Sequence, residues 1–174
     1  MRWLTIAVTA MIVVTVQTTL APRLAIDGAW PDLVLIIAVF LGLHVRNLDG
    51  VAAAFVLGLL ADLQSCERLG MLALIYGLIA WGVYLCSDWF FRRHVLTHVA
   101  MTFVAGVLAH GTLMLYYTAV AGTAGSHGGR LVLMIALYSA VCAPPIHALG
   151  LRLAPWLGLD TPRYTHARFS RSVS

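Results

Sequence analysis

The stretch from Trp30 to Trp81 decides the fold that we expect for this chain. It reads WPDLVLIIAVFLGL over residues 30–43 and GVAAAFVLGLLADLQSCERLGMLALIYGLIAW over residues 50–81. Apolar runs broken by short polar turns are typical of helices in a lipid bilayer, where each helix satisfies its own backbone hydrogen bonds. The stretch therefore predicts consecutive membrane helices.

The composition of the whole chain also indicates a membrane protein. Of its 174 residues, 61% are hydrophobic and 10% are charged, whereas soluble domains have about 45–50% apolar and about 25% charged residues. So few charges could not cover a surface that faces water. This excludes a soluble globular domain, a disordered chain and a secreted disulfide scaffold.

Six apolar segments follow one another and predict an all-α integral membrane domain, a six-transmembrane-helix bundle over residues 1–153. A helix needs about 20 apolar residues to cross about 30 Å of hydrocarbon. The second and third segments are short, so they either cross together or form a re-entrant hairpin. Residues 154–174 form a basic tail that we expect in the cytoplasm. The six segments are 3–20, 31–45, 50–63, 69–91, 95–121 and 131–153.

The positions of the arginines predict the orientation of the bundle. Cytoplasmic segments of membrane proteins carry an excess of basic residues. With six spans, one side holds both chain ends and most of the arginines, so both termini are expected in the cytoplasm. That side has Arg2, Arg46, Arg92, Arg93, Arg152, Arg163, Arg168 and Arg171, and the other side has Arg23, Arg68 and Arg130.

Small residues recur at helical spacing in the third and fourth segments. Residues four apart lie on one face of a helix, and small side chains there let a neighbouring backbone approach closely. We therefore expect these two helices to pack together near the centre of the bundle. The two faces contain Gly50, Ala54 and Gly58 in the third segment, and Gly70, Ala73, Gly77 and Ala80 in the fourth.

Two carboxylates lie at the predicted outer ends of spans. Asp62 continues the small-residue face to the end of its helix, where the helix dipole disfavours negative charge. It therefore needs a partner, and an ion pair with Arg23, Arg68 or Arg130 is preferred over a ligand site. Asp32 follows Pro31 at a helix start, where proline and negative charge are both favoured.

Histidines are the other polar candidates within the predicted spans. His110 lies near the middle of the fifth segment, and His147 lies in the sixth, just after two prolines. Ionisable groups inside a membrane are candidates for function, although a neutral, hydrogen-bonded histidine is the plainer alternative. His94 and His98 have the i, i+4 spacing of metal ligands but no third ligand beside them. We therefore predict no metal site.

The sequence contains none of the motifs that carry catalysis. It has no phosphate-binding glycine loop, no nucleophile elbow and no zinc-protease helix motif. The arginines are spread over short loops rather than gathered in a patch for nucleic acid. We therefore expect neither an enzyme, nor a cofactor, nor a nucleic-acid partner.

The same central stretch resembles the rod shape-determining protein MreD family. Its members have a Pro-Asp-Leu start before an apolar span, then Gly-Leu-x-x-Asp, a serine, and a Leu-Gly that opens the next span. The matching positions are Pro31, Asp32, Leu33, Gly58, Leu59, Asp62, Ser65, Leu69 and Gly70. Trp30 stands where the family often has arginine, and the polar loop Cys66-Glu67-Arg68 stands where the family has small residues.

The resemblance implies a non-enzymatic scaffold of the elongation machinery in the bacterial inner membrane. Such a scaffold binds MreC and, through the complex, connects MreB filaments with the peptidoglycan synthase RodA and its transpeptidase partner. It helps to control wall synthesis and a rod shape. The outer surface around Asp32, Asp62, Ser65 and Arg68 is then the candidate to receive the partner.

A transport subunit is the alternative. Proteins of this family are similar in architecture to the six-helix substrate-binding subunits of energy-coupling-factor vitamin transporters, in which an outward pocket holds a small molecule. A pocket near Asp62 would serve that purpose. Against this alternative, Ala7 and Ala10 are three residues apart, so the first segment lacks an Ala-x-x-x-Ala docking motif.

Overall fold

The computed structural model describes residues 3–45, 48–65, 69–87, 95–121 and 128–157. The described chain is all-helical, and the prediction of six helices is confirmed. Its elements are α1 (Trp3–Leu20), the short 3-10 helix η1 (Ala21–Leu24), α2 (Leu33–His44), α3 (Asp49–Ser65), α4 (Met71–Cys86), α5 (Val95–Ala121) and α6 (Gly128–Leu157).

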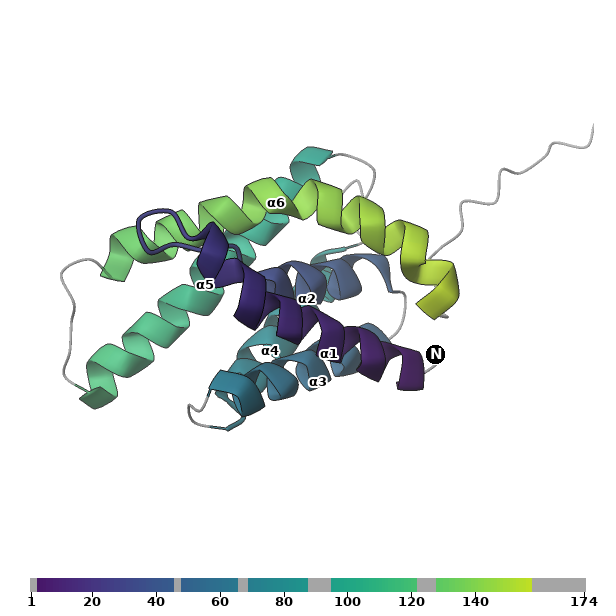
Figure 1. The fold of residues 1–174 in the computed structure, drawn as a ribbon, viewed down its shortest axis with the longest axis horizontal. Helices are drawn as coiled ribbons and strands as arrows, with labels where there is room; N and C mark the ends of the chain where they lie inside the picture. Colours follow the sequence, from purple (N-terminus) through teal and green to yellow (C-terminus); the bar gives the residue numbers. More distant parts are fainter. Residues whose placement is uncertain (1–2, 46–47, 66–68, 88–94, 122–127, 158–174) are drawn as a thin grey trace, which may run out of the picture.

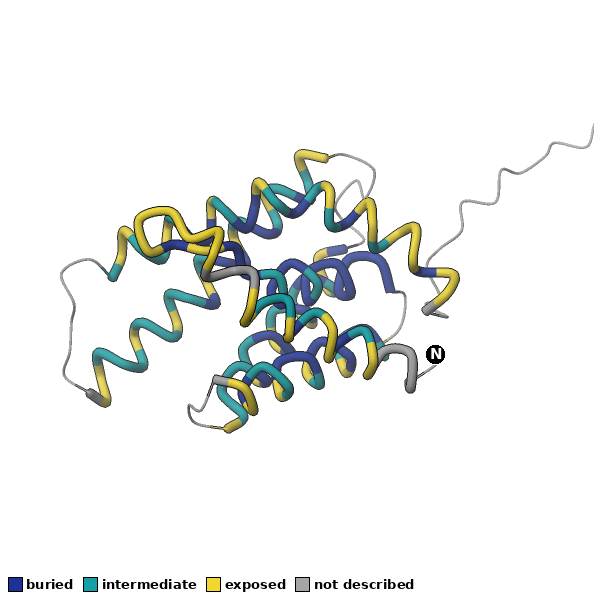
Figure 2. The backbone as a smooth tube through the Cα atoms, in the orientation of Figure 1, coloured by how far each residue is buried: buried dark blue, intermediate teal, exposed yellow. Residues whose placement is uncertain are grey.

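Helix α2 forms the centre of the bundle. Ten of its 12 residues are buried, and it contacts each of the other five α-helices. In Figure 1, α6 arches along the upper edge and α3 and α4 lie along the lower edge, with α2 between them. Figure 2 shows α2 as the most continuously buried segment. A helix that is apolar all around, as this one is, can be buried on every face.

Two helices are long and apolar enough to cross a membrane by length and composition, Val95–Val120 and Gly128–Trp156. Shorter apolar helices are Ala7–Thr19, Leu33–His44 and Met71–Cys86. Helix α2 rises about 18 Å, less than the hydrocarbon thickness of about 30 Å. Its flanking residues Pro31, Asp32 and Val45 are buried by protein, so the backbone beyond the helix ends is shielded as membrane depth would require.

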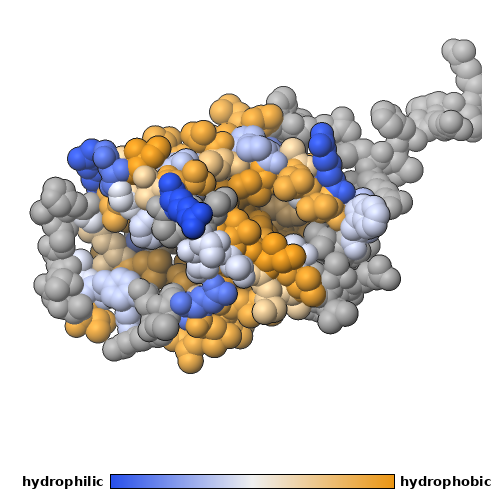
Figure 3. Space-filling view, viewed as in Figure 1, coloured by the Kyte–Doolittle hydropathy of each residue, from blue (hydrophilic) through white to orange (hydrophobic). Residues whose placement is uncertain are grey.

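The exterior of the bundle is apolar. Large hydrophobic side chains are exposed on every α-helix except α2, and hydrophobic residues cover much of the face seen in Figure 3. Soluble monomers rarely expose apolar surface so widely. The exterior therefore suits contact with lipid.

The small-residue face of α3 packs against two neighbours. A Cβ built at Gly58 would lie 2.6 Å from the Cα of Ala73 in α4, and one at Gly50 would lie 2.8 Å from the carbonyl oxygen of Leu41 in α2. Ala54, between them, is fully buried. Any side chain larger than hydrogen at Gly58 would push the two backbones apart.

The two glycines expected to pack at and within α4, Gly70 before its first residue and Gly77 inside it, differ from each other. A Cβ built at Gly77 would lie 3.2 Å from the ring of Phe55, which is a tight interhelical contact. Nothing lies within 4 Å of a Cβ built at Gly70, whose φ is +95°. The expectation that Gly70 is a packing residue is therefore wrong. Its role is conformational, because glycine alone adopts this left-handed backbone without steric cost.

Candidate functional site

The side chain of Asp32 caps the N-terminus of α2. Its Oδ1 accepts a 3.0 Å hydrogen bond from the backbone N–H of Leu35, in the first turn of the helix. The backbone N–H of Asp32 itself donates to the hydroxyl of Ser139 in α6 at 2.9 Å. The helix start predicted from Pro31 and Asp32 therefore also ties α2 to α6.

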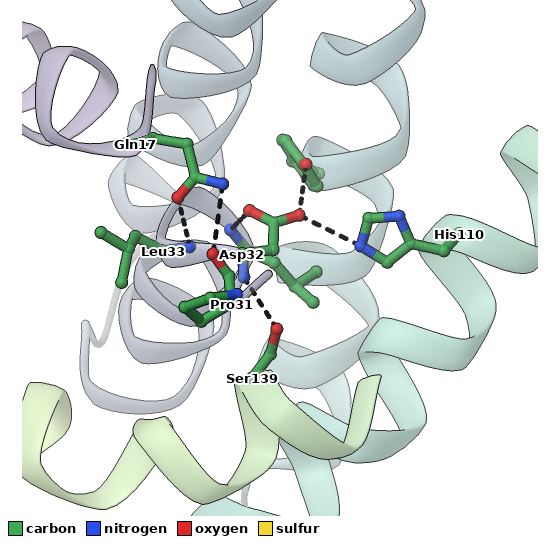
Figure 4. A network of polar contacts seen from close by, with 8 residues as sticks. Gln17, Pro31, Asp32, Leu33, His110 and Ser139 are labelled. Atoms are coloured by element: carbon green, nitrogen blue, oxygen red, sulfur yellow. Dashed lines mark hydrogen bonds and ion pairs between the residues drawn. The ribbon is translucent and has the colours of Figure 1, made fainter. Parts of the chain in front are cut away.

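The other carboxylate oxygen of Asp32 faces α4 and α5. Oδ2 accepts a 2.7 Å hydrogen bond from the hydroxyl of Tyr76 and lies 3.3 Å from Nε2 of His110. Figure 4 shows the ring of His110 directed at this oxygen. Because Asp32 is 4% exposed, its negative charge depends on these contacts and on the positive end of the α2 dipole.

Gln17 connects α1 to the same point. Its Oε1 accepts a 2.8 Å hydrogen bond from the N–H of Leu33, and its Nε2 donates to the carbonyl oxygen of Pro31 at 3.3 Å. Figure 4 shows the Gln17 amide spanning the backbone on either side of Asp32. Helices α1, α2, α4, α5 and α6 thus meet at one polar centre, in which Asp32, Tyr76 and Ser139 are buried and two residues are partly buried. We call it the Asp32 centre: Gln17, Asp32, Tyr76, His110 and Ser139.

A pocket of about 460 Å³ opens onto the Asp32 centre. Five helices line it: α1 and α3 near their C-termini, α2 and α4 near their N-termini, and α5 from its middle toward its C-terminus. Helices that alternate in direction bring these ends to the same side of a bundle. The polar and aromatic lining consists of Gln17, Thr18, Trp30, Asp32, Gln64, Tyr76, His110 and Tyr117.

A second cavity, of about 580 Å³, lies between α4 and α5. Apart from Thr112 and Cys86, its lining is apolar or glycine. It offers few groups that could orient a polar ligand. The pocket at the Asp32 centre is therefore the candidate functional site.

Asp62 binds the beginning of α4. Its carboxylate accepts three hydrogen bonds of 3.0 Å each, from the backbone N–H groups of Gly70, Leu72 and Ala73. The first amides of a helix lack partners within the helix and carry its positive dipole end. The carboxylate near the end of α3 is thus compensated by the start of α4.

Of the arginines expected to pair with Asp62, Arg130 contacts another carboxylate. Arg130 lies 3.9 Å from Asp27 in a pair that is largely exposed to solvent. Arg68 lies outside the described residues, and Ser65 is the last residue of α3. An Asp62–Arg68 pair stays a prediction. The three backbone N–H groups already compensate the negative charge of Asp62 at the end of α3.

Three histidines form a second buried cluster, between α2, α5 and α6. Nδ1 of His98 lies 2.6 Å from Nδ1 of His147, and the ring of His44 stacks on that of His98. Nε2 of His147 lies 3.2 Å from the carbonyl oxygen of Ile36, and Nδ1 of His44 lies 3.2 Å from that of Phe40. Each carbonyl requires an N–H on the facing nitrogen, so His147 presents its Nδ1 lone pair to His98.

The two histidines singled out in the sequence therefore belong to different clusters. His110 lies at the Asp32 centre, and His147 pairs with His98. His94, the expected neighbour of His98, lies outside the described residues. Among the residues that are described, no three His, Cys, Asp or Glu side chains are arranged to hold a metal ion.

Sequence reasoning missed four residues that these clusters need. A single amide or hydroxyl in an apolar segment is the signal that could have identified Gln17 and Ser139. Tyr76 lies next to Gly77, and the spacing of the small residues gave no sign that this tyrosine is polar-bonded. His44 lies at the end of an apolar run, where a histidine is expected at the membrane surface. None of these positions reveals its partner, because the partners come from other helices.

A family model described as rod shape-determining protein MreD matches residues 1–149. No curated protein and no solved structure matches the chain.

Proposed function

The chain belongs to the MreD family of rod shape-determining proteins, and on that basis we propose that it binds MreC through the pocket at the Asp32 centre. Membership makes it a non-catalytic, shape-determining membrane protein. The proposal adds that it is a scaffold of the elongation machinery. Through MreC it connects with MreB, RodA and the transpeptidase partner of RodA.

The proposed topology has six crossings, with both termini in the cytoplasm of a bacterial inner membrane. The apolar exterior and the long helices α5 and α6 support the crossings. The distribution of arginines supports the orientation. Under this topology the C-terminal ends of α1, α3 and α5 and the N-terminal ends of α2 and α4 share the outer side, which is where the pocket opens.

The single observation that carries the proposal is the pocket that opens onto a buried carboxylate. Trp30 and Tyr117 supply rigid aromatic surface, while Gln64 and His110 supply hydrogen-bonding groups. Binding sites for proteins commonly combine such aromatic anchors with a few buried polar groups. A bitopic partner with a domain on the outer side would meet this pocket where its chain leaves the membrane.

Asp62, Ser65 and Arg68 have a supporting role in the proposal. Asp62 joins the end of α3 to the start of α4, across the turn between them, through the amides of Gly70, Leu72 and Ala73. That turn follows Gln64, which lines the pocket. Ser65, which precedes the turn in sequence, and Arg68, which belongs to it, would then contact the partner at the rim.

A small-molecule transport subunit is the second candidate. The volume of about 460 Å³ lies within the usual range for ligand pockets, about 300–1,000 Å³. The pocket is centred on Asp32 rather than on Asp62, whose carboxylate faces the α4 amides. The resemblance to the substrate-binding subunits of energy-coupling-factor transporters remains part of this second proposal.

Affinity purification from nanodiscs, with bound proteins and small molecules identified by mass spectrometry, tests the two candidates against each other. Near-stoichiometric MreC supports the scaffold, whereas a transporter ATPase pair or a retained vitamin-like ligand supports the transport subunit. Tyr117→Ala should reduce recovery of MreC, because it removes an aromatic wall of the pocket. Leu133→Ala, an exposed residue of α6 outside the pocket, is the matched control and should not.

A further inference from the structure

We infer that α1 is a movable wall of the pocket and that the side chain of Gln17 holds this wall closed. The inference rests on the proposed function in one respect, because it takes the pocket to be the site that MreC enters. It adds a means of regulating entry. The inference is carried by the burial of α1, by its hydrogen bonds and by its share of the pocket lining.

Helix α1 buries few of its described side chains. Among its side chains at residues 7–19, those of Ala10 and Val14 are buried, whereas α2 buries ten of 12 residues. Burial of apolar side chains against protein is what distinguishes a fixed helix from a weakly held one. Exposed residues of α1 such as Val8 and Met11 can stay in lipid wherever the helix lies.

Side chains in the C-terminal half of α1 form hydrogen bonds of two kinds. The hydroxyls of Thr15, Thr18 and Thr19 donate to carbonyl oxygens of α1 itself, so they would move with the helix. Gln17 instead bonds to the C=O of Pro31 and the N–H of Leu33. Rotation of the Gln17 side chain alone breaks both contacts. We call this reversible connection between α1 and the start of α2 the latch.

The groups that Gln17 holds would not be stranded in an open state. The N–H of Leu33 belongs to the first turn of α2 and has no partner within that helix. Next to an open pocket it can bond to water, as the carbonyl of Pro31 can, or to a peptide group of a partner. Val14, Gln17 and Thr18 form the α1 part of the lining, so outward movement of this end of α1 opens the pocket from the side.

Distance measurement between two spin labels tests the inference without the partner. The labels are placed at Thr19 in α1 and Leu115 in α5, both exposed, after Cys66, Cys86 and Cys142 are replaced by serine. Double electron–electron resonance is recorded on the full chain in nanodiscs. We expect one narrow distance distribution in the otherwise unchanged chain, and a longer, broader one in Gln17→Leu.

Two further variants keep the test decisive. Thr15→Val removes a hydroxyl that bonds within α1 and should leave the distances unchanged. Gln17→Glu keeps an acceptor for Leu33 but loses the donor to Pro31, so it should give both populations. A distribution in Gln17→Leu and Gln17→Glu identical to that of the parent chain would overturn the inference.

Addition of purified MreC separates the inference from the proposed function. MreC should shift the parent chain to the long distance, and it should associate with Gln17→Leu about tenfold faster because the opening step is removed. Failure of MreC to bind the parent chain refutes the proposed function. The distances between the spin labels then still test whether Gln17 holds α1 in place. Binding of MreC with no change in distance refutes the movable wall alone.

Discussion

The hydroxyl of Tyr76 donates a 2.7 Å hydrogen bond to the carboxylate of Asp32, which joins the N-terminus of α2 to α4. One turn earlier in α4, the N–H groups of Leu72 and Ala73 donate to the carboxylate of Asp62 in α3. Two acidic residues from different helices thus hold the same end of α4. This arrangement fixes the walls of the pocket on two sides.

Replacing Asp32 should destabilise the protein by an amount that depends on what replaces it. Asparagine keeps an oxygen that can cap the N–H of Leu35, whereas alanine loses both the cap and the acceptor for Tyr76. We expect the free energy of unfolding to fall by about 1–2 kcal/mol for Asp32→Asn and about 2–4 kcal/mol for Asp32→Ala. Thermal unfolding in detergent micelles measures both, with Tyr76→Phe as the partner in a double-mutant cycle. If the losses of stability in the Asp32 variant and in Tyr76→Phe simply added in the double variant, that result would contradict a direct contact between the two side chains.

Asp62→Asn should loosen the beginning of α4. Asparagine has one acceptor oxygen where the carboxylate has two, so at least one of the three N–H groups loses its partner. Hydrogen–deuterium exchange of the amides of Gly70, Leu72 and Ala73 should accelerate about tenfold. Asp27→Asn, at an exposed pair with Arg130, is the control. Unchanged exchange at all three amides would show that Asp62 does not cap the helix.

A charge swap between Asp62 and Arg130 should fail. Asp62→Arg places a cation against the positive end of the α4 dipole, and Arg130→Asp leaves the new arginine without a carboxylate because Arg130 lies beside Asp27. We therefore expect the double variant to restore neither rod shape nor protein level in cells. Rescue would mean that Arg130 approaches Asp62 in the assembled complex.

Gly58→Leu should separate α3 from α4. Even the first side-chain carbon would lie 2.6 Å from the Cα of Ala73, so the helices must move apart at an expected cost of about 1–3 kcal/mol. Gly82→Leu is the matched control, because nothing lies within 4 Å of a Cβ there. Thermal unfolding and gel filtration compare the two variants. Equal stability and assembly of both would refute close packing at Gly58.

The pair of His98 and His147 should show strong energetic coupling. His147→Ala leaves the carbonyl of Ile36 and the ring of His98 without this partner, at an expected cost of about 1–3 kcal/mol. If the two rings contact each other as the structure shows, the double alanine variant should lose less stability than the two single losses added together. Unfolding in micelles gives all three values, and strict additivity would place the rings apart.

Local information in the sequence was sufficient for the helices and for several of their contacts. Continuous apolar runs define helices whatever their partners, which is why six helices could be expected. The sequence indicated that the third and fourth segments pack near the centre, whereas α2 occupies the centre of the bundle. The spacing of Gly50 and Gly58 indicated a packing face for the same reason. Gly70 shows the limit of that logic, because a glycine can serve close approach or a left-handed turn and spacing does not distinguish them.

Charge alone indicated that Asp62 needs compensation, but not what supplies it. Arginines are the obvious candidate partners in a sequence, because the residue type alone specifies their positive charge. Backbone N–H groups cannot be singled out from the sequence, because every residue except proline has one. Only the fold decides which of them lack a backbone partner and lie beside a carboxylate. The same holds for Gln17, whose two partners are the backbone groups of Pro31 and Leu33.

The sequence by itself determined that the chain is a bundle of six apolar helices of the MreD family, because hydrophobicity and motif spacing are properties of the chain alone. The tertiary structure decided which polar side chains meet. Asp32, Tyr76, His110, Ser139 and Gln17 lie on five different helices, and buried polar groups take whatever partner the packing brings within about 3 Å. The pocket and its latch exist only once those helices are assembled.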